Sequence, residues 1–407
     1  MHSTESSNIQ NKDLSVTNRP IRILHVIGGM NRGGIETWLM HILRNIDRQK
    51  FQMDFLVGVE EPCAYDDEIR SLGGNIICCP LSKRQPWKYT SQLKDLLLEH
   101  GPYDIIHSQV YFFSGIVLRV AEKVNIPTRI VHVHPLSDIK EKDLLRPLYR
   151  SFMTNLIARH SNWLLTPSKN TLEAFKAICD CSKMNVEILY NGVDLPKFKK
   201  TIDRDAVRRQ YSLPVDQPIV IFVARFAPHK NHLQMLRVAA QVKQQGEKVH
   251  WVMVGSHGEM LPTLRAKTAE LDNVSLLEGV ADISELLLAA DLFFFPSVEE
   301  GFGVVAIEAA AAGLPVVATN LDTIAEACAP SNRNYMFPPN DDDTARKNIL
   351  KIIRDANLRA SLATDAQKWA DNFDIKNSVN GLSSIYLQAQ STSKDVGLNS
   401  QALSSSK

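Results

Sequence analysis

The chain has 407 residues, of which 44% are hydrophobic and 22% are charged, and its formal net charge is +1. That length exceeds one ordinary hydrophobic core, which predicts two domains, and the balanced charge gives no reason to expect nucleic acid as a partner. The six cysteines lie in spacings that resemble neither a zinc site nor a disulfide framework, so reduced thiols are expected.

Both ends of the chain are polar. Residues 1–19 lack the apolar core of a signal peptide, and residues 391–407 are rich in Ser and Lys, so a disordered tail is expected at each end. The sequence contains no run of ~18 apolar residues, which predicts a cytoplasmic protein without a membrane span.

Short apolar runs alternate with amphipathic segments over residues 20–195. Runs such as IRILHVI, QMDFLV and RIVHVH are typical of buried strands, and helices are expected over 34–46, 86–100, 111–124 and 144–160. Because these strands are almost continuously apolar, a parallel sheet covered by helices on both faces is expected.

The same alternation begins again after a polar segment. Residues 196–217 are charged and contain prolines, which predicts an interdomain linker, and strand-like runs such as PIVIFVAR and DLFFFPS then recur over 218–370. A helix over 371–390 is expected to pack back toward the first domain. The predicted fold class is α/β, with two Rossmann-like doubly wound domains that face each other across a cleft and bind ligands at the carboxyl ends of strands.

The stretch 297–320, SVEEGFGVVAIEAAAAGLPVVATN, contains the first candidate site. A strand precedes it, Glu300 lies in the following loop, and Glu308 lies within an otherwise apolar helix. Gly301 and Gly303 let the backbone approach a ligand closely, and the first turn of the helix favours an anion such as phosphate. An ionised carboxylate removed from water needs a partner, and the hydroxyl groups of a sugar and a ribose are suitable donors.

This stretch resembles the E-x7-E segment of the retaining glycosyltransferases of family 4, which have the GT-B fold. Four further segments resemble that family in the same order along residues 20–390: VIGGMNRGGIETWL, YNGVD, VARFAPHKN and VGSHGEM. The last of these departs from the family's usual Gly-Asp-Gly-Pro turn at Ser256 and His257. The resemblance is closest to bacterial enzymes that assemble polysaccharides.

The resemblance implies the roles of several residues. Arg225 and Lys230 would stabilise the departing nucleoside diphosphate, Glu308 would accept hydrogen bonds from the ribose, and Glu300 would hold the transferred sugar. The implied donor-binding set is Gly33, Gly34, Arg225, Lys230, Gly255, Glu300, Gly301, Phe302, Gly303, Val304 and Glu308. Together with His134, residues Arg225, Lys230 and Glu300 form the implied catalytic set.

The family's first-domain histidine falls in the segment RIVHVHP. His132 and His134 are two residues apart and so would point to one face of a strand, and His134 is favoured because it lies nearer the strand end. In the family's favoured mechanism the acceptor attacks on the front face of the donor sugar and loses its proton to the departing phosphate. No protein nucleophile is therefore expected.

No metal ion or other cofactor is expected. The run Asp341–Asp343 precedes a helical segment and is typical of helix-capping acids. The predicted enzyme transfers a sugar from a nucleotide sugar, with a UDP-sugar favoured over a GDP-sugar, to a glycan or lipid-linked acceptor. The alternatives are a non-catalytic sensor of nucleotide sugars and an epimerase or phosphorylase on the same architecture.

One basic segment suggests contact with a membrane surface. Lys142, Arg146 and Arg150 would share one helix face, while Leu148 and Phe152 lie on another. A solvated helix face is the default interpretation. Peripheral docking on the cytoplasmic side of an anionic membrane, which would bring the enzyme to a lipid-linked acceptor, is the alternative hypothesis.

Overall fold

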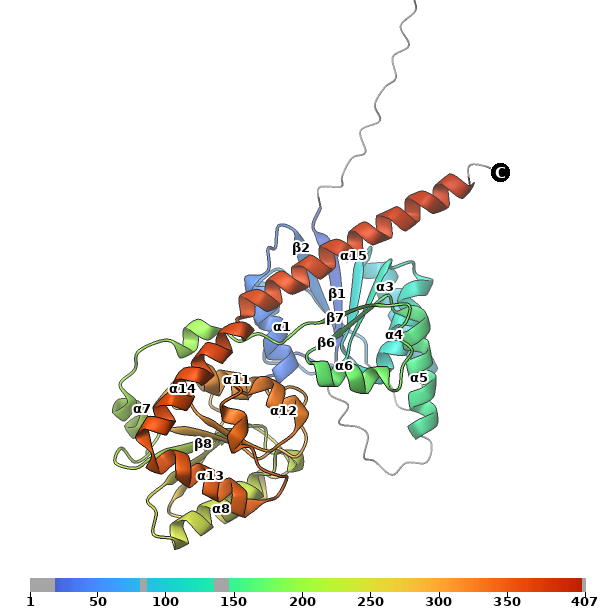
Figure 1. Cartoon of the computed structure of the whole chain (residues 1–407). Coiled ribbons are helices and arrows are strands. Elements are labelled where there is room, and N and C mark those ends of the chain that lie inside the picture. The colour runs from blue at the N-terminus through green and yellow to red at the C-terminus, as the bar shows by residue number, and fades with distance from the viewer. Residues whose placement is uncertain (1–18, 81–85, 135–145, 405–407) are drawn as a thin grey trace, which may run out of the picture.

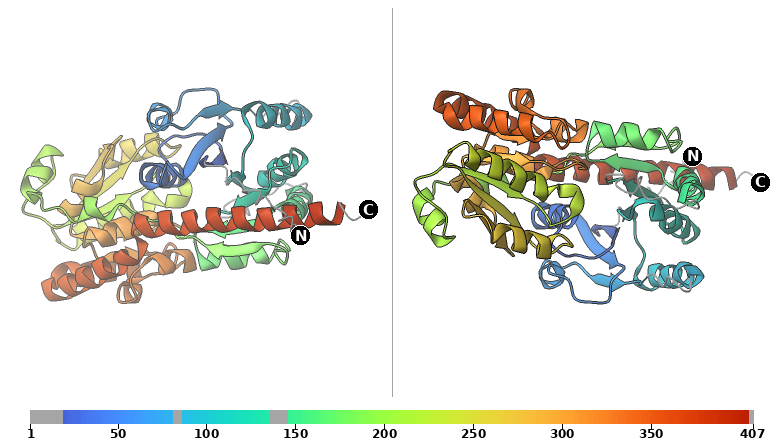
Figure 2. Two further views of the ribbon diagram at one scale, coloured as in Figure 1. Left: turned by 90° about the horizontal axis from the view of Figure 1, so that it is seen from above. Right: turned by 90° about the horizontal axis from the view of Figure 1, so that it is seen from below.

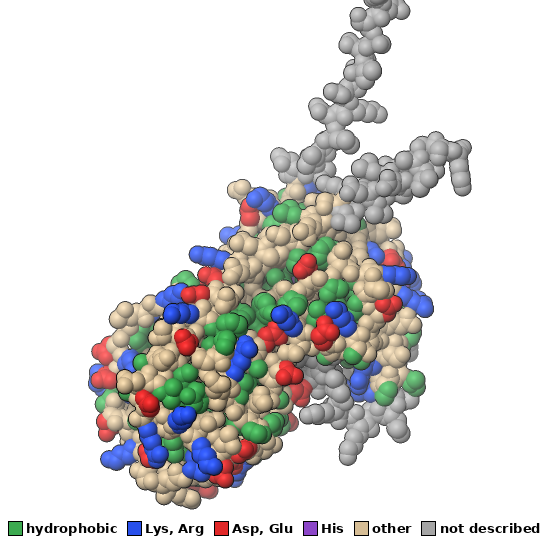
Figure 3. All heavy atoms as spheres, viewed as in Figure 1, with side chains coloured by type: hydrophobic (Ala, Val, Ile, Leu, Met, Phe, Trp, Pro, Cys, Tyr) green, Lys and Arg blue, Asp and Glu red, His purple; other side chains and the backbone are tan. Residues whose placement is uncertain are grey.

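The computed structural model describes residues 19–80, 86–134 and 146–404, and it contains two domains that each surround a parallel β-sheet (Figures 1 and 2). Most of the expected tail at residues 1–19 lies outside the described residues. Lys and Arg side chains are interspersed with Asp and Glu over the face drawn in Figure 3. No helix in the described part of the chain combines the length and the apolar character that crossing a bilayer requires.

The first domain contains a seven-stranded sheet in the order β3-β2-β1-β4-β5-β6-β7. The edge strand β7 was not predicted, because its side chains alternate between exposed and half-buried positions and so lack a continuous apolar run. The elements are β1 Ile21–Ile27, α1 Gly34–Asn45, β2 Phe51–Val57, α2 Asp66–Ser71, β3 Ile76–Cys78, α3 Pro86–His100, β4 Ile105–Ser108, η1 Tyr111–Phe113, α4 Ser114–Lys123, β5 Thr128–His132, α5 Arg146–His160, β6 Trp163–Thr166, α6 Lys169–Lys176 and β7 Asn185–Ile188.

The second domain contains a five-stranded sheet in the order β10-β9-β8-β11-β12. A connecting segment with η3 Leu195–Phe198 and α7 Arg204–Gln210 leads into it. The elements are β8 Ile219–Val223, η4 Pro228–Lys230, α8 His232–Gln244, β9 His250–Gly255, α9 Leu261–Thr268, β10 Val274–Glu278, α10 Ser284–Ala289, β11 Leu292–Phe295, α11 Val304–Ala311, β12 Val316–Ala318, α12 Asp322–Ala327, η5 Asn332–Tyr335, α13 Asp342–Arg354 and α14 Ala356–Ala370.

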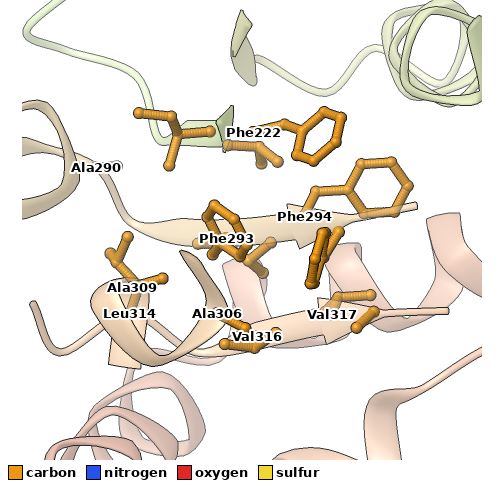
Figure 4. Close-up of a cluster of buried hydrophobic side chains, with 14 of the residues drawn as sticks. Phe222, Ala290, Phe293, Phe294, Ala306, Ala309, Leu314, Val316 and Val317 are labelled. Atoms are coloured by element: carbon orange, nitrogen blue, oxygen red, sulfur yellow. The ribbon is translucent and has the colours of Figure 1, made fainter. Parts of the chain in front are cut away.

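Large aromatic side chains fill the core of the second domain. Phe222 of β8 and Phe293 and Phe294 of β11 are completely buried, and Figure 4 shows them together with Ala306 of α11 and Val317 of β12. The small alanines of α11 let this helix approach the sheet closely, so the helix that carries Glu308 is held tightly against β11 and β12.

The strand order of each sheet reverses direction at one point, between β1 and β4 in the first domain and between β8 and β11 in the second. Ligands of doubly wound sheets bind in the crevice at such a point, beyond the carboxyl ends of the strands. The predicted site residues Gly33 and Gly34 follow β1, Arg225 follows β8, and Glu300 follows β11. The topology therefore brings these segments to the two switch points.

Much of the segment expected to be a linker, residues 196–217, folds onto the second domain. The Arg208 side chain of α7 is buried, donates to the Ala289 carbonyl oxygen at 2.8 Å and forms an ion pair of 2.8 Å with Asp291. The Asp291 carboxylate also pairs with Arg204 and accepts from the backbone N–H of Ile219 at the start of β8. Two of the charged residues in the expected linker, Arg204 and Arg208, are therefore paired with polar groups of the second domain.

The two segments that cross between the domains are hydrogen-bonded to each other. The Val193 N–H donates to the Phe373 carbonyl at 2.8 Å, and the Ile375 N–H donates to the Val193 carbonyl at 2.9 Å. The ring of Tyr190 packs against Phe302 and Phe373, with centroid distances of 5.4 and 5.5 Å. Both crossings and the loop that carries Phe302 thus meet in one aromatic cluster.

A single carboxylate of the second domain binds several groups of the first. Glu326 of α12 accepts from the backbone N–H of Lys169 at 3.0 Å and from the Asn170 amide at 3.3 Å. The Tyr190 hydroxyl donates to the same carboxylate at 2.9 Å. Lys169 begins α6, so Glu326 places negative charge at the positive end of that helix and contributes to domain contact.

The last helix, α15 Ile375–Ser404, follows η6 Asp371–Phe373 and runs along the first domain (Figures 1 and 2). Its side chains Leu382 and Tyr386 are buried in the same core cluster as Trp38 and Phe51. The tail expected to be disordered from residue 391 is helical as far as Ser404. A Ser-rich composition lowers helix propensity, but the segment contains no proline that would end the helix.

We expect Asp291→Ala to lower the free energy of unfolding by about 3 kcal/mol, because it leaves the buried Arg208 guanidinium without its carboxylate. Urea denaturation measures this loss. The matched control is Arg265→Ala, which breaks the surface ion pair with Glu278, where the Arg265 side chain is 61% exposed. That change should cost much less, because water screens an exposed ion pair. Equal costs for the two variants would contradict the structural role of Asp291.

Candidate active site

Two loops of the second domain meet at the carboxyl ends of β8 and β11. Lys230 forms an ion pair with the Glu300 carboxylate, and each of the two side chains is 16% exposed. The Val298 N–H donates to the His229 carbonyl at 2.9 Å, which joins the two loops through the backbone as well. The sequence predicted both charged residues as site residues but did not predict that they pair. Arg225, on the same side of the sheet, is exposed.

The loop that follows Glu300 leads directly into the N-terminus of α11. Gly303, the residue before this helix, has φ +77°, and an added Cβ would lie 2.9 Å from the Phe295 ring, so glycine is required there. No side chain caps this end of the helix. The Ala306 N–H donates to the Gly303 carbonyl, and the backbone N–H groups of Val304 and Val305 in the first turn are available to an anion.

The side chain of Phe302 does not face a ligand site. It is 3% exposed and packs in the cluster with Tyr190 and Phe373, at a centroid distance of 5.6 Å from Phe373. The backbone of Phe302 remains part of the loop, as do its neighbours Gly301 and Gly303. The side chain thus links the predicted donor loop to the interdomain crossings, which sequence reasoning did not anticipate.

Glu308 lies one helical turn beyond the start of α11 and is half-buried. Burial raises the pKa of its carboxyl to about 7, and the negative charge of Asp282 adds to that effect, while Lys197 opposes it. Among the described residues, no hydrogen bond from a side chain or the backbone to this carboxylate is found. The group is therefore ready to accept hydrogen bonds from a bound molecule.

The turn after β9 contains the departure from the family pattern. An added Cβ at Gly255 would lie 2.3 Å from the Ala224 carbonyl oxygen, and one at Gly258 would lie 2.1 Å from the Phe226 carbonyl oxygen. The two glycines therefore let the turn pack directly on the segment after β8. Ser256 and His257 between them are exposed, and the Ser256 Oγ and His257 Nδ1 atoms are 3.2 Å apart.

In the first domain the glycine loop ends at Gly33 and Gly34, where α1 begins without a side-chain cap. Glu36 of the first helical turn folds back over the loop, and an added Cβ at Gly33 would lie 2.3 Å from a Glu36 carboxylate oxygen. Burial raises the pKa of Glu36, and the positive charge of Arg225 from the other domain opposes this shift.

Sequence reasoning missed Glu36. Its signal is a carboxylate in the first turn of a helix that follows two glycines, and only the fold places it opposite Arg225.

The predicted His134 follows β5 and is 2% exposed. Its ring stacks on that of His132 at a centroid distance of 4.4 Å, so the two histidines lie on the same face as predicted. Burial lowers the pKa of His134 to about 3, so the ring is neutral at physiological pH. Its Nε2 atom lies 3.2 Å from the Gln109 amide oxygen. Residues 135–145 lie outside the described part of the chain.

Within the described residues, no group of three or more His, Cys, Asp or Glu side chains is arranged to hold a metal ion. Asp341 caps α13 and accepts from the Thr344 N–H at 2.9 Å, as expected for helix-capping acids.

Solved structures share this architecture. The Anabaena protein Alr3699/HepE in complex with UDP-glucose has a TM-score of 0.77 at 21% identity, covering 90% of this chain and 99% of that one. WaaG, a glycosyltransferase involved in lipopolysaccharide biosynthesis, has a TM-score of 0.70 at 18% identity, and the match covers 89% of this chain and 99% of WaaG. The fold and the paired loops define a GT-B protein with two Rossmann-like domains, as the sequence predicted.

Sequence comparisons give the family. Residues 32–197 match the model for Glycosyltransferase Family 4, and residues 203–369 match that for Glycosyl transferases group 1. EpsF of Bacillus subtilis (strain 168), assigned as a glycosyltransferase, is 33% identical over 75% of this chain and 80% of its own length. The D-inositol 3-phosphate glycosyltransferase of Salinispora arenicola is 28% identical over 92% of this chain and 91% of its own length. The chain belongs to the family 4 glycosyltransferases, and it is an enzyme of that class.

We expect the parent protein to lose stability relative to Glu308→Gln as the pH rises from 4.5 to about 7. In this window the unfolded carboxyl, with its ordinary pKa of 4.5, loses its proton while the buried group with a pKa of about 7 retains it. At this site the folded state therefore binds more protons, and the contribution of Glu308 to the free energy of unfolding declines by an amount on the order of 2 kcal/mol.

Urea denaturation of the parent and Glu308→Gln proteins at several pH values measures this difference. Above about pH 7 the two curves should run parallel, because Glu308 is then ionised in both the folded and the unfolded parent. Parallel curves from pH 4.5 upward would contradict the burial of the carboxyl.

Proposed function

We propose that the protein transfers a sugar, with retention of configuration, from a nucleotide sugar to a glycan or lipid-linked acceptor in the assembly of a surface or exported polysaccharide. A UDP-sugar is the favoured donor, and a GDP-sugar is the second candidate. The observation that carries this proposal is the Lys230–Glu300 ion pair beside the uncapped N-terminus of α11.

The departing diphosphate requires positive charge, which the second domain supplies. A cation about 4 Å from the developing charge contributes up to ~4 kcal/mol at an effective dielectric near 20. Lys230 and Arg225 are the candidates for this role, and the first-turn N–H groups of α11 add fixed dipoles. When Lys230 pairs with phosphate oxygens of the donor instead of with Glu300, the Glu300 carboxylate becomes free to accept hydrogen bonds from hydroxyl groups of the transferred sugar.

Glu308 would accept hydrogen bonds from the ribose hydroxyls. The partly exposed carboxyl has a pKa raised to about 7, so partners that donate hydrogen bonds favour its ionised form and lower that pKa again. Glu36 would balance the positive charge of Arg225 in the ligand-free protein. When the donor binds, Arg225 would interact with the diphosphate instead. The acceptor hydroxyl would attack on the face from which the diphosphate leaves and give its proton to that group, without a metal ion.

The choice of donor and pathway draws support from relatives. Alr3699/HepE, which shares this fold, is solved with UDP and with UDP-glucose, and WaaG acts in lipopolysaccharide biosynthesis. These similarities favour a uridine nucleotide and a polysaccharide acceptor for this chain. No feature of the described residues favours the alternatives of a non-catalytic sensor or an epimerase.

Release of nucleoside diphosphate from a panel of UDP-, GDP- and ADP-sugars tests the proposal. The parent enzyme should release one diphosphate, and both Lys230→Met and Glu300→Gln should lower this turnover, the lysine variant by about a hundredfold because a preorganised cation is lost. Lys243→Met is the matched control, since Lys243 forms a surface ion pair with Asp272 in the same domain.

With extracted glycan and lipid acceptors supplied, the same assay distinguishes a transferase from a sensor and from an epimerase. Thermal stabilisation by a donor without release of diphosphate would favour the sensor, and conversion of the donor sugar without transfer would favour the epimerase. Equal turnover in the Lys230→Met and Lys243→Met variants would contradict the assigned role of Lys230.

We also propose that α5 docks on an anionic membrane surface. Leu148, Tyr149 and Phe152 near the start of this helix are 69%, 44% and 55% exposed. The sequence pattern placed Leu148 and Phe152 apart from the basic face, and in the structure they point to solvent rather than into the core. The Arg150 guanidinium lies over the Phe112 ring at 5.9 Å, and Lys142 lies outside the described residues. An exposed apolar pair beside basic residues suits an interfacial helix.

Replacing Leu148 and Phe152 by Ser should weaken sedimentation with vesicles of phosphatidylglycerol and phosphatidylcholine by about tenfold or more, because two apolar side chains no longer enter the interface. Leu98→Ser is the matched control, since Leu98 is 60% exposed on α3 of the same domain. Absence of vesicle binding by the parent protein would end this proposal.

A further inference from the structure

Six polar side chains form a buried cluster, the histidine network, beneath the switch point of the first domain. They come from β1, from β4 and the residue after it, from the end of β5, and from α15. Each of these side chains is at most 3% exposed. The members are His25, His107, Gln109, His132, His134 and Tyr386.

The network is a continuous series of hydrogen bonds that begins at His134. His134 Nε2 lies 3.2 Å from Gln109 Oε1, and Gln109 Nε2 lies 3.1 Å from His25 Nδ1. His25 Nε2 lies 3.3 Å from the Tyr386 hydroxyl.

Beyond Tyr386 the series continues to the strand that carries His134. The Tyr386 hydroxyl lies 2.8 Å from His107 Nδ1, and His107 Nε2 lies 3.3 Å from His132 Nδ1. Because the His132 and His134 rings stack, the series returns to its starting point.

All four imidazoles are neutral at physiological pH. Burial lowers the pKa of His25 and of His134 to about 3, and it lowers the pKa of His107 and of His132 well below the usual range. A neutral imidazole has one N–H donor and one acceptor nitrogen, so a bond made at one nitrogen determines the role of the other.

The orientation of the Gln109 amide sets the direction of the whole series. Its oxygen faces His134, which therefore carries its proton on Nε2 and donates. The Gln109 N–H donates to His25 Nδ1, so His25 donates from Nε2 to Tyr386, Tyr386 donates to His107, and His107 donates to His132. The last proton lies on His132 Nε2, a buried atom that has no hydrogen-bond partner within the described chain.

A polar network of this kind costs more free energy than an apolar core of the same volume, and one unpartnered buried nitrogen adds to that cost. The network lies under the carboxyl ends of β1, β4 and β5, where the glycine loop and His134 are located, and not elsewhere in the sheet. This placement indicates a role in the site rather than in general packing.

We propose that Gln109 is a positioning residue that fixes His134 in its neutral Nε2–H form, and that Tyr386 connects this histidine to helix α15. In that form the lone pair lies on His134 Nδ1, which accepts no hydrogen bond from the described residues and is suited to a hydroxyl group of the donor sugar. The inference rests on the proposed role of His134 in donor binding.

Nitrogen-detected NMR of protein labelled in the histidine rings tests the tautomer directly and needs no activity. In the parent, His134 should give the signature of one neutral tautomer with the proton on Nε2. In Gln109→Leu, which removes both hydrogen bonds at similar volume, the signature should change to the other tautomer or to a mixture. An unchanged signature would overturn the proposal.

Measurements of turnover distinguish a role of Gln109 in orienting His134 from a role in packing alone. With the donor and acceptor found in the panel, Gln109→Leu should lower kcat about tenfold while KM for the donor changes less than about twofold, since the ring is present but misoriented. Tyr386→Phe keeps the buried ring and removes the hydroxyl, and it should lower kcat by a smaller factor. Ser161→Ala, which removes a buried hydroxyl bond to the Ile157 carbonyl in the same domain, should leave kcat unchanged.

His134→Ala distinguishes failure of the inference from failure of the proposed function. If His134→Ala leaves turnover unchanged, His134 has no role in the reaction, and the connection to catalysis is overturned whatever the tautomer. If His134→Ala impairs turnover but Gln109→Leu alters neither the tautomer nor kcat, only the positioning role of Gln109 is overturned.

Discussion

The position of the site depends on the backbone pairing between Val193 and the segment from Phe373 to Ile375. The candidate site residues are divided between two sheets that share no strand, so their relation is set where the chain crosses from one domain to the other. The Tyr190 ring packs at this point against Phe302, which belongs to the loop between Glu300 and α11. A change in the angle between the domains must therefore repack a side chain of the donor loop itself.

The structure contains two kinds of polar group that are removed from water to different extents. The carboxyl of Glu308 has no hydrogen-bond donor among the described residues, so its ionised form is costly until a ligand supplies donors. The histidine network instead satisfies nearly all of its own groups and stays neutral. In the proposed function, Glu308 gains affinity for the donor through the ligand's hydrogen bonds, whereas the histidine network holds the His134 ring in one chemical form before any ligand arrives.

Sequence reasoning predicted most strands because parallel sheets buried on both faces leave continuous apolar runs. It failed at β7, whose half-exposed edge position gives no such run, and at α7, where charges pair with Asp291 and backbone carbonyls. Motif spacing identified Glu300, Lys230 and Glu308 as candidates. It could not predict the Lys230–Glu300 pair, the position of Glu36 opposite Arg225, or the contact of Tyr386 with His25, since these depend on how distant segments meet in three dimensions.

The boundary between η6 and α15 limits how the two domains can move. Asp374 is the only residue between the two helical segments, and its backbone angles are φ −58° and ψ 134°. Since α15 is buried against the first domain and α14 belongs to the second, this crossing has almost no slack. The domains can therefore turn about an axis close to Asp374 but cannot slide apart at this point, so a change in their relative orientation is a rotation whose largest displacement falls on the loops farthest from that residue.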